Sequence, residues 1–160
     1  MAKRGLKPED TVCFNIKSSW HAISRMYNNA GNEYDLTASL GYVLLNIDLE
    51  NGTPATKIAP ILGMEPRSLT RMLKSMEERG LIYREADKKD KRMVRIFLTE
   101  SGKEKRELAR IAVKAFNAAV WDRISQEKLN TFFEVINSIN QIVTDKHIYE
   151  QEKSKLLADL

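Results

Sequence analysis

The chain has 160 residues, of which 42% are hydrophobic and 30% are charged, and its formal net charge is +4. These proportions are ordinary for a globular protein and exclude a disordered chain. The longest apolar run has eight residues, against the ~18 that a membrane-spanning helix needs, and a single cysteine, Cys13, excludes an internal disulfide and a multi-cysteine zinc site. The first ten residues lack the apolar stretch of a secretory signal, so we predict a cytoplasmic protein.

The first two predicted helices are amphipathic. Residues 11–30 carry apolar side chains three or four positions apart, a spacing that places them on one helix face. This stripe consists of Val12, Ile16, Trp20, Ile23 and Tyr27. A second helix is predicted to begin after Thr37, whose hydroxyl suits an N-cap, and to stop at Asn51 and Gly52.

A short third helix is predicted to follow at once. Thr53 and Pro54 suit its cap and its first helical position, and Gly63 breaks it. Pro60 lies in its middle, where proline deletes one backbone hydrogen bond, so we expect a kink there.

A fourth helix and a hairpin complete the central segment. The helix is predicted to open at Pro66 and to end at Gly80, with one apolar and one polar side. Residues 81–85 and 93–98 are predicted strands joined by a charged turn. The order helix, turn, helix, hairpin is that of a winged helix-turn-helix.

The charge of this central segment is unevenly positive. Residues 54–99 hold eleven Lys or Arg against six Asp or Glu, whereas the rest of the chain holds fifteen against sixteen. The excess positive charge therefore lies in one segment, as in proteins that bind a polyanion. Much of it sits at the hairpin tip, on Lys88, Lys89, Lys91 and Arg92.

The terminal segments are predicted to be dimerisation helices. Thr99 and Ser125 suit the caps of two long helices, and the second has a strong apolar stripe that includes Leu129, Phe132 and Phe133. A winged helix of ~60 residues has too little surface to cover these stripes and that of the first helix, so a homodimer is expected. A monomeric helical cap is the alternative. The predicted fold is mainly α with a small β-hairpin wing.

The polar side of the fourth helix is suited to the major groove of DNA. Arginine pairs with guanine edges and serine can donate or accept, whereas lysine and helix N-termini suit phosphates. The predicted DNA-binding residues are Arg67, Ser68, Arg71, Lys74 and Ser75 on the helix, with Lys91 and Arg92 on the wing. The aspartates of the turn, Asp87 and Asp90, are expected to accept backbone N–H bonds and to pair with Arg84 or Arg92, which would stiffen the wing.

Residues 36–102 resemble the MarR family of bacterial transcriptional regulators in detail. The resemblance is carried by LTRMLKSMEERGLIYR, by the wing element Asp90-Lys91-Arg92 and by the exit LTESG, in this order and spacing. The terminal helices agree in placement. The expected organisation is a dimerisation helix in residues 1–35, a DNA-binding domain in 36–99 and dimerisation helices in 100–160.

The resemblance implies a homodimer that binds double-stranded DNA at pseudo-palindromic promoter sites, usually as a repressor released by a small ligand or by oxidation. It implies that Arg67, Ser68 and Arg71 read the major groove, that Arg92 enters the minor groove and that Asp90 braces the wing. Pro60 departs from the family pattern, in which this position is usually an ordinary helix former.

Two kinds of switch are open. Cys13, near the start of the first helix and fourteen residues before Tyr27, resembles the peroxide-sensing branch of the family, although Ala38 stands where a second tyrosine is expected. An inert buried thiol is the alternative. The other switch is a small aromatic or apolar effector, for which Trp20, His21, Tyr27 and Tyr42 are candidate contacts.

Other classes of function have little support in the sequence. His21 and His147 have no companions at metal-ligand spacing, and there is no phosphate-binding glycine loop, no nucleophile with a base and no catalytic carboxylate pair. We predict no cofactor, no metal and no enzymatic activity. A winged helix retained as a protein-interaction module remains the alternative to a DNA-binding regulator.

Overall fold

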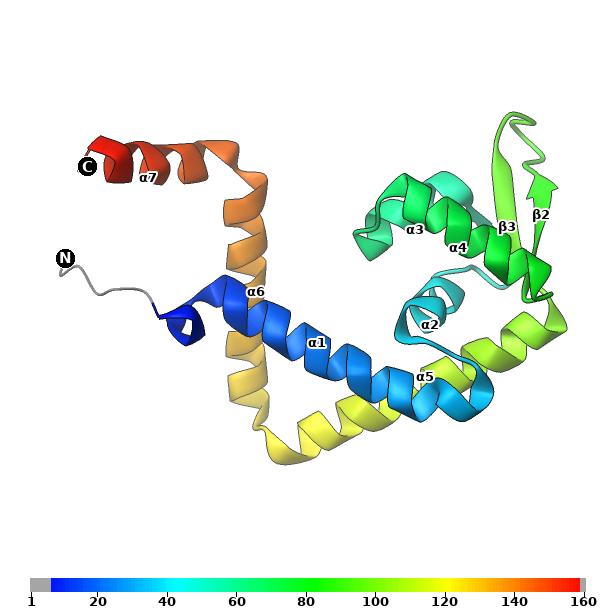
Figure 1. The fold of residues 1–160 in the computed structure, drawn as a ribbon, viewed down its shortest axis with the longest axis horizontal. Helices are drawn as coiled ribbons and strands as arrows, with labels where there is room; N and C mark the ends of the chain where they lie inside the picture. Colours follow the sequence, from blue (N-terminus) through cyan, green and yellow to red (C-terminus); the bar gives the residue numbers. More distant parts are fainter. Residues whose placement is uncertain (1–6, 159–160) are drawn as a thin grey trace. The chain divides into compact units, whose positions relative to one another are not determined.

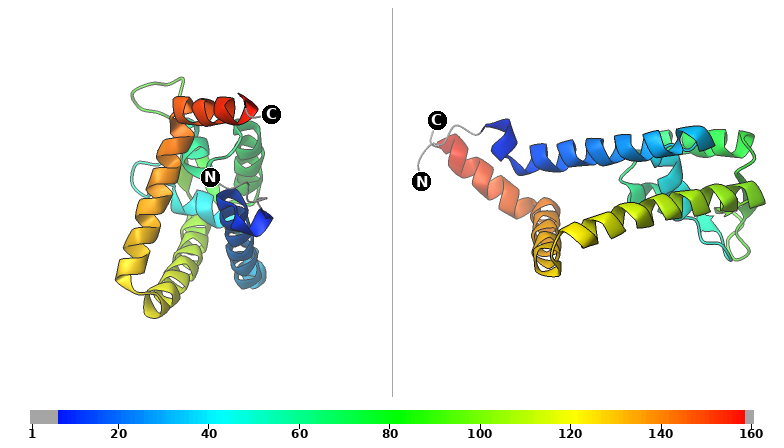
Figure 2. Two further views of the ribbon diagram at one scale, coloured as in Figure 1. Left: turned by 90° about the vertical axis from the view of Figure 1, so that its left-hand side faces the viewer. Right: turned by 90° about the horizontal axis from the view of Figure 1, so that it is seen from below.

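The computed structural model describes residues 7–158 and is mainly helical, as predicted (Figure 1 and Figure 2). Residues 1–6 and 159–160 of the predicted terminal segments, with most of the stretch tested for a secretory signal, lie outside the described residues. In chain order the helices are α1 (Val12–Gly31), α2 (Ala38–Leu45), α3 (Ala55–Leu62), α4 (Pro66–Glu78), α5 (Glu100–Arg123), α6 (Gln126–Thr144) and α7 (Lys146–Ala158). Short 3-10 turns, η1 (Pro8–Asp10) and η2 (Asn32–Tyr34), flank α1. Within the described range, no helix is long and apolar enough to cross a bilayer.

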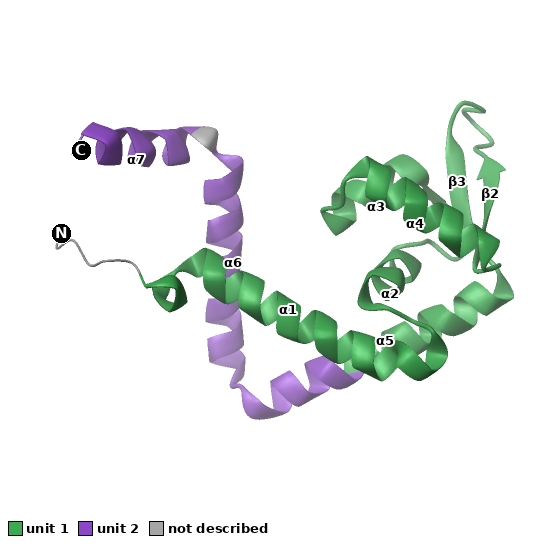
Figure 3. Ribbon diagram, viewed as in Figure 1, with its two compact units in different colours: residues 1–114 green, residues 115–160 purple. Residues whose placement is uncertain are grey.

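The chain divides into two compact units, residues 1–114 and 115–160 (Figure 3). The first contains α1 to α4, the β-sheet and the beginning of α5, and the second contains the end of α5 with α6 and α7. In the first unit, α2, α3 and α4 pack with the sheet around Leu44, Ile47, Ile58, Met76 and Ile96, which are fully buried. This core fixes α4 and the wing with respect to each other.

The sheet has three strands, not the two of the predicted hairpin. β1 (Thr53–Pro54), β3 (Val94–Leu98) and β2 (Ile82–Ala86) lie in that order and are antiparallel. The assignment of Thr53 and Pro54 to the start of a helix was therefore wrong, and α3 begins at Ala55. Pro54 fits here because β1 is an edge strand, where a residue without an N–H breaks no pairing.

Local capping signals were read correctly at several helix ends. The Thr37 hydroxyl accepts the N–H of Leu40 at 3.2 Å, and the Thr99 hydroxyl accepts that of Gly102 at 3.0 Å. Gly63 ends α3 with a positive φ of 59°, and the N–H of Met64 reaches back to the Ala59 carbonyl at 3.0 Å. α3 itself remains helical beyond Pro60 to Leu62.

Helix α2 ends earlier than predicted, at Leu45. The following loop is ordered by Asp48, whose carboxylate accepts the N–H groups of Glu50 at 3.0 Å and Asn51 at 2.6 Å. The buried Thr53 hydroxyl closes the loop by accepting the N–H of Asp48 at 2.9 Å and donating to the Asn46 carbonyl at 3.2 Å. The loop therefore has a defined shape where it meets the wing.

Each unit presents large apolar side chains that are about half exposed or more. On α1, Val12, Ile16 and Trp20 are each about half exposed. On α6, Phe132 and Phe133 are about half exposed and Val143 is 76% exposed. Exposed stripes of this length are typical of surfaces that another chain covers.

Candidate DNA-binding surface and ligand pocket

Helix α4 presents a polar face opposite its buried face. Leu69, Leu73 and Met76 are buried in the core, and Met72 packs against it. At 100° per residue, the opposite side of the helix carries the residues predicted to contact DNA. All of them, Arg67, Ser68, Arg71, Lys74 and Ser75, are exposed. The structure thus brings the predicted helix residues together on one accessible surface.

The basic side chains of this face are accessible to a ligand. Lys74 makes a 3.8 Å contact with Glu78, but both side chains are largely exposed, so this pair contributes little to stability. Thr70, which was not among the predicted DNA contacts, is exposed at the edge of the same face, and its hydroxyl donates to the Pro66 carbonyl at 2.8 Å. It lies one turn from both Arg67 and Lys74.

The wing, the turn between β2 and β3, projects beyond α4 (Figure 1). Its lysines and Arg92 are exposed, whereas Asp87 is 4% exposed. One oxygen of the Asp87 carboxylate accepts the N–H groups of Lys89 at 2.7 Å and Asp90 at 3.0 Å. These bonds fold the turn around a buried carboxylate and leave the basic side chains outside.

Asp87 also anchors the wing to the body of the first unit through Arg95. The Arg95 guanidinium forms an ion pair with the second Asp87 oxygen and donates to the carbonyls of Asn51 at 2.9 Å and Gly52 at 3.1 Å. A charge-assisted contact of this kind is stronger than a neutral one. The pair therefore ties the wing to the loop before β1.

The side chains expected to brace the wing have other partners. Arg84 pairs with Glu77 at 2.9 Å, which links β2 to the end of α4, and does not contact an aspartate of the turn. Asp90 accepts the backbone N–H of Arg92 at 3.0 Å, as an aspartate in a turn was expected to do. The expected pairing of a turn aspartate with Arg84 or Arg92 is thus corrected, because the arginine that reaches the turn is Arg95.

Asp87 should make the protein sensitive to strong acid. Its bonds to Arg95, and next to the N–H groups of Asp90 and Lys89, lower the pKa of the carboxyl from 3.8 to about 2. A lowered pKa stabilises the folded state above the ordinary value, and this contribution is lost as the pH falls through about 2. The melting temperature of the wild type should therefore exceed that of Asp87→Asn by several degrees at pH 5, and the gap should close towards pH 2. A difference in melting temperature that stays constant from pH 5 to pH 2 would contradict a lowered pKa of Asp87.

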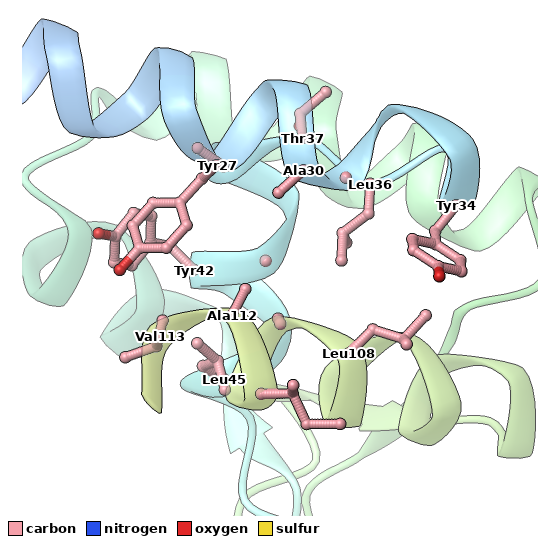
Figure 4. Close-up of a pocket in the computed structure, with 15 residues that line it drawn as sticks. Tyr27, Ala30, Tyr34, Leu36, Thr37, Tyr42, Leu45, Leu108, Ala112 and Val113 are labelled. Carbon is pink, nitrogen blue, oxygen red and sulfur yellow. The ribbon is translucent and has the colours of Figure 1, made fainter. Parts of the chain in front are cut away.

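The first unit also contains a largely apolar pocket between α1, α2 and α5, with a volume of about 210 Å³. Figure 4 shows Tyr27 and Tyr42 at one end of it and Tyr34 at the other, with Leu108 and Ala112 along the α5 wall. Burial raises the pKa of the Tyr27 hydroxyl, with a smaller contribution from Tyr42, and burial also raises that of Tyr42. Both phenols are therefore neutral hydrogen-bonding groups at physiological pH.

The pocket gathers only part of the predicted switch residues. Tyr27 and Tyr42 line it, in an edge-to-face contact at 6.4 Å, and Trp20 lies 5.4 Å from the Tyr42 ring. His21 is exposed and is not among the lining residues. Leu108 and Ala112 on α5 were not predicted, since nothing in the local sequence indicates that they share a pocket with Tyr34 of the η2 turn.

Cys13 is exposed in the single chain, at the start of α1. Its thiol donates to the Thr11 hydroxyl at 3.5 Å. Tyr27 lies fourteen residues further along the same helix, or ~21 Å at the α-helical rise, so the two do not meet within one chain. A sensor that joins them would have to draw its tyrosine from a second chain.

Similarity to known proteins agrees with this geometry. The profile of the MarR family matches residues 36–94, from two residues before α2 to the first residue of β3. The HTH-type transcriptional regulator SarZ of Staphylococcus aureus is 32% identical over 143 residues, which cover 89% of this chain and 93% of SarZ.

Two solved structures share the fold. The S. aureus MepR–DNA complex superposes with a TM-score of 0.75 at 20% identity, covering 82% of this chain and 97% of MepR. CouR from Rhodococcus jostii RHA1, bound to p-coumaroyl-CoA, gives 0.72 at 23% identity, covering 84% and 95%. The family profile, the likeness to SarZ along nearly the whole chain, and the winged helix with its exposed basic face agree. The chain belongs to the MarR family of DNA-binding transcriptional regulators.

Proposed function

We propose that the protein is a homodimeric repressor that binds a pseudo-palindromic operator through α4 and the wing. The observation that carries this proposal is the exposed face of α4, with Arg67, Ser68 and Arg71 beside a wing whose basic side chains are also exposed. α4 would enter the major groove and Arg92 the adjacent minor groove, where the negative potential is strongest. Regulation rather than catalysis is the role of the relatives named above.

A second copy of the chain would cover the exposed stripes of α1 and α6. A two-fold axis pairs the same surface on both chains, and two winged helices then reach half-sites one DNA turn apart, or ~34 Å. The exposure of Val12 and Ile16 on α1, and of Phe132 and Phe133 on α6, supports this arrangement.

The pocket supports release from DNA by a small effector. Its lining is mostly aliphatic, with three tyrosines and Thr37 to supply hydrogen bonds and no charged side chain. Such a site suits a neutral, apolar or aromatic molecule with one or two polar groups. The fold accepts a ligand in at least one case, since CouR was solved with p-coumaroyl-CoA.

Redox control through Cys13 is the second candidate, and the exposure of the thiol favours it, because an accessible sulfur can be reached by an oxidant. Both candidates, and DNA binding itself, are tested by fluorescence anisotropy with duplex DNA from upstream of the gene and excess non-specific competitor. Competitor-resistant binding supports the regulator. If cumene hydroperoxide abolishes DNA binding by the wild type but not by Cys13→Ser, the switch is oxidation of Cys13. If the oxidant does not change DNA binding, the pocket remains as the candidate effector site. Failure to bind any DNA specifically would favour a protein-interaction module.

A further inference from the structure

The turn between α1 and α2 is held by two basic side chains from other elements. The Arg79 guanidinium, at the C-cap of α4, donates to the Asp35 carbonyl at 2.7 Å and forms an ion pair with the Asp35 carboxylate. The Lys105 ammonium, on α5, donates to the Tyr34 carbonyl. The end of α4 and helix α5 thus each donate a hydrogen bond to one of two consecutive carbonyl groups in the same short turn. We call these contacts the turn clamp.

The same turn forms a wall of the pocket. Tyr34 and Leu36, the neighbours of Asp35, both line it, and Leu108 lines it one turn along α5 from Lys105 (Figure 4). A molecule that fills the pocket therefore touches the two residues on either side of the one that Arg79 holds.

The turn is also held by contacts with the two helices that it joins. Asp35 has a φ of +50°, which few side chains adopt, and the N–H of Leu36 donates to the Gly31 carbonyl at 3.0 Å. A Cβ on Gly31 would lie 1.9 Å from the Leu36 carbonyl oxygen, so the backbone is in close contact there. The side-chain carbonyl of Asn28 accepts the N–H of Ala38 at 2.8 Å and fixes the far end. A displacement of Tyr34 or Leu36 would therefore also displace Asp35.

We propose that Arg79 is a positioning residue which, through the turn clamp, couples occupation of the pocket to the orientation of α4. The inference rests on the proposed function, since it takes α4 as the DNA-contacting helix and the pocket as the effector site. Without a ligand, the closed clamp would hold α4 in its DNA-binding position. A bound ligand displaces the turn, and Arg79 carries the displacement to the end of α4. Because a ligand shifts an equilibrium only through contacts that differ between two states, loss of the clamp should remove the coupling and leave the two sites able to bind.

The first unit offers a matched control for Arg79. Arg84 also forms an ion pair at the C-terminal end of α4, with Glu77, and the two arginine side chains are equally exposed at 34%. Its partner lies on α4 itself and not on the turn. Replacing either arginine by alanine removes one comparable ion pair, but only Arg79→Ala opens the turn clamp.

The test is a pair of double-mutant cycles that need no identified ligand. Ala112→Phe fills the pocket from its α5 wall and stands in for a ligand. Operator affinity is measured by anisotropy for the wild type, Ala112→Phe, Arg79→Ala, Arg84→Ala and the two double variants. Filling the pocket should weaken operator binding by about tenfold in the wild type and in Arg84→Ala, a usual size for allosteric coupling. In Arg79→Ala the same substitution should change affinity by less than about twofold.

Each other outcome overturns the inference. A tenfold effect that persists in Arg79→Ala would show that the clamp does not transmit it. The absence of any effect of Ala112→Phe in the wild type, repeated with Ala30→Phe on the α1 wall, would show that the turn does not respond to the pocket. Arg79→Gln replaces Arg79→Ala if circular dichroism shows a folding defect. If the wild type itself binds no operator, the proposed function fails. If the wild type binds the operator but the effects of Ala112→Phe and Arg79→Ala are additive, only the inference about the turn clamp fails.

Discussion

Replacing Phe133 by aspartate is expected to convert the protein to monomers and to weaken operator binding by at least about 100-fold, since two linked binding modules gain about 10²–10⁴ over either alone. Phe133 is about half exposed on the apolar stripe of α6 and belongs to no buried core, so the monomer should still fold. At a two-fold interface each substitution occurs twice, and two carboxylates would be buried without partners. Sedimentation velocity and anisotropy on the same samples measure both effects.

Ser138→Asp is the control for this substitution. Ser138 lies on the opposite side of α6, is exposed, and its hydroxyl donates to the Glu134 carbonyl at 3.0 Å within the helix. The same charge placed there should leave both the dimer and DNA binding intact. A Phe133→Asp protein that remains dimeric would show that the α6 stripe is not the interface.

Arg67→Ala should cost ~1–3 kcal/mol of operator binding and should relax the preference at one base pair of each half-site. Arg67 is exposed at the second position of α4, and the N-terminal residues of a recognition helix are those that reach base edges. A guanidinium can bind both acceptors of a guanine, and alanine leaves that base unread. Affinities for operators changed one base pair at a time will show the position at which discrimination is lost.

Arg92→Ala provides the contrast. Arg92 is exposed at the wing, and in the proposed complex its side chain would meet the DNA backbone and the minor groove rather than the major-groove edges. Its loss should weaken binding about equally for all sequences and should reduce the slope of log affinity against log salt by roughly one. If Arg67→Ala also weakened all sequences equally, α4 would not be reading bases.

The parts of this fold that local chemistry decides were predictable from the sequence. The faces of α4 follow from the spacing of Leu69, Leu73 and Met76, and the break at Gly63 follows from the freedom of glycine to adopt positive φ. Strand β1 was missed because two residues carry no periodic signal, and their pairing with β3, more than forty residues later, depends on the tertiary fold.

The functional sites also divide into features that one helix determines and features that depend on tertiary packing. The exposed residues of α4 could be read from one helix, but the wing anchor could not. Strand register places Arg95 opposite Glu85 and so diagonal to Asp87, and an offset of one residue would have turned its side chain to the other face. The pocket joins Tyr34 to Leu108, and the clamp joins Asp35 to Arg79. Neither contact can be predicted from the local sequence, because both form only when α2, α4 and α5 pack together.

The central claim, sequence-specific binding of two symmetric half-sites, is tested most directly by selecting duplexes from random DNA with the full-length wild-type protein. The account predicts enrichment of an inverted repeat whose half-site centres lie ~10 base pairs apart, and competitor-resistant binding that weakens steeply as salt is raised. It also predicts that this enrichment is lost in Phe133→Asp. Recovery of no consensus, or of a single asymmetric site bound equally well by Arg67→Ala, would contradict it.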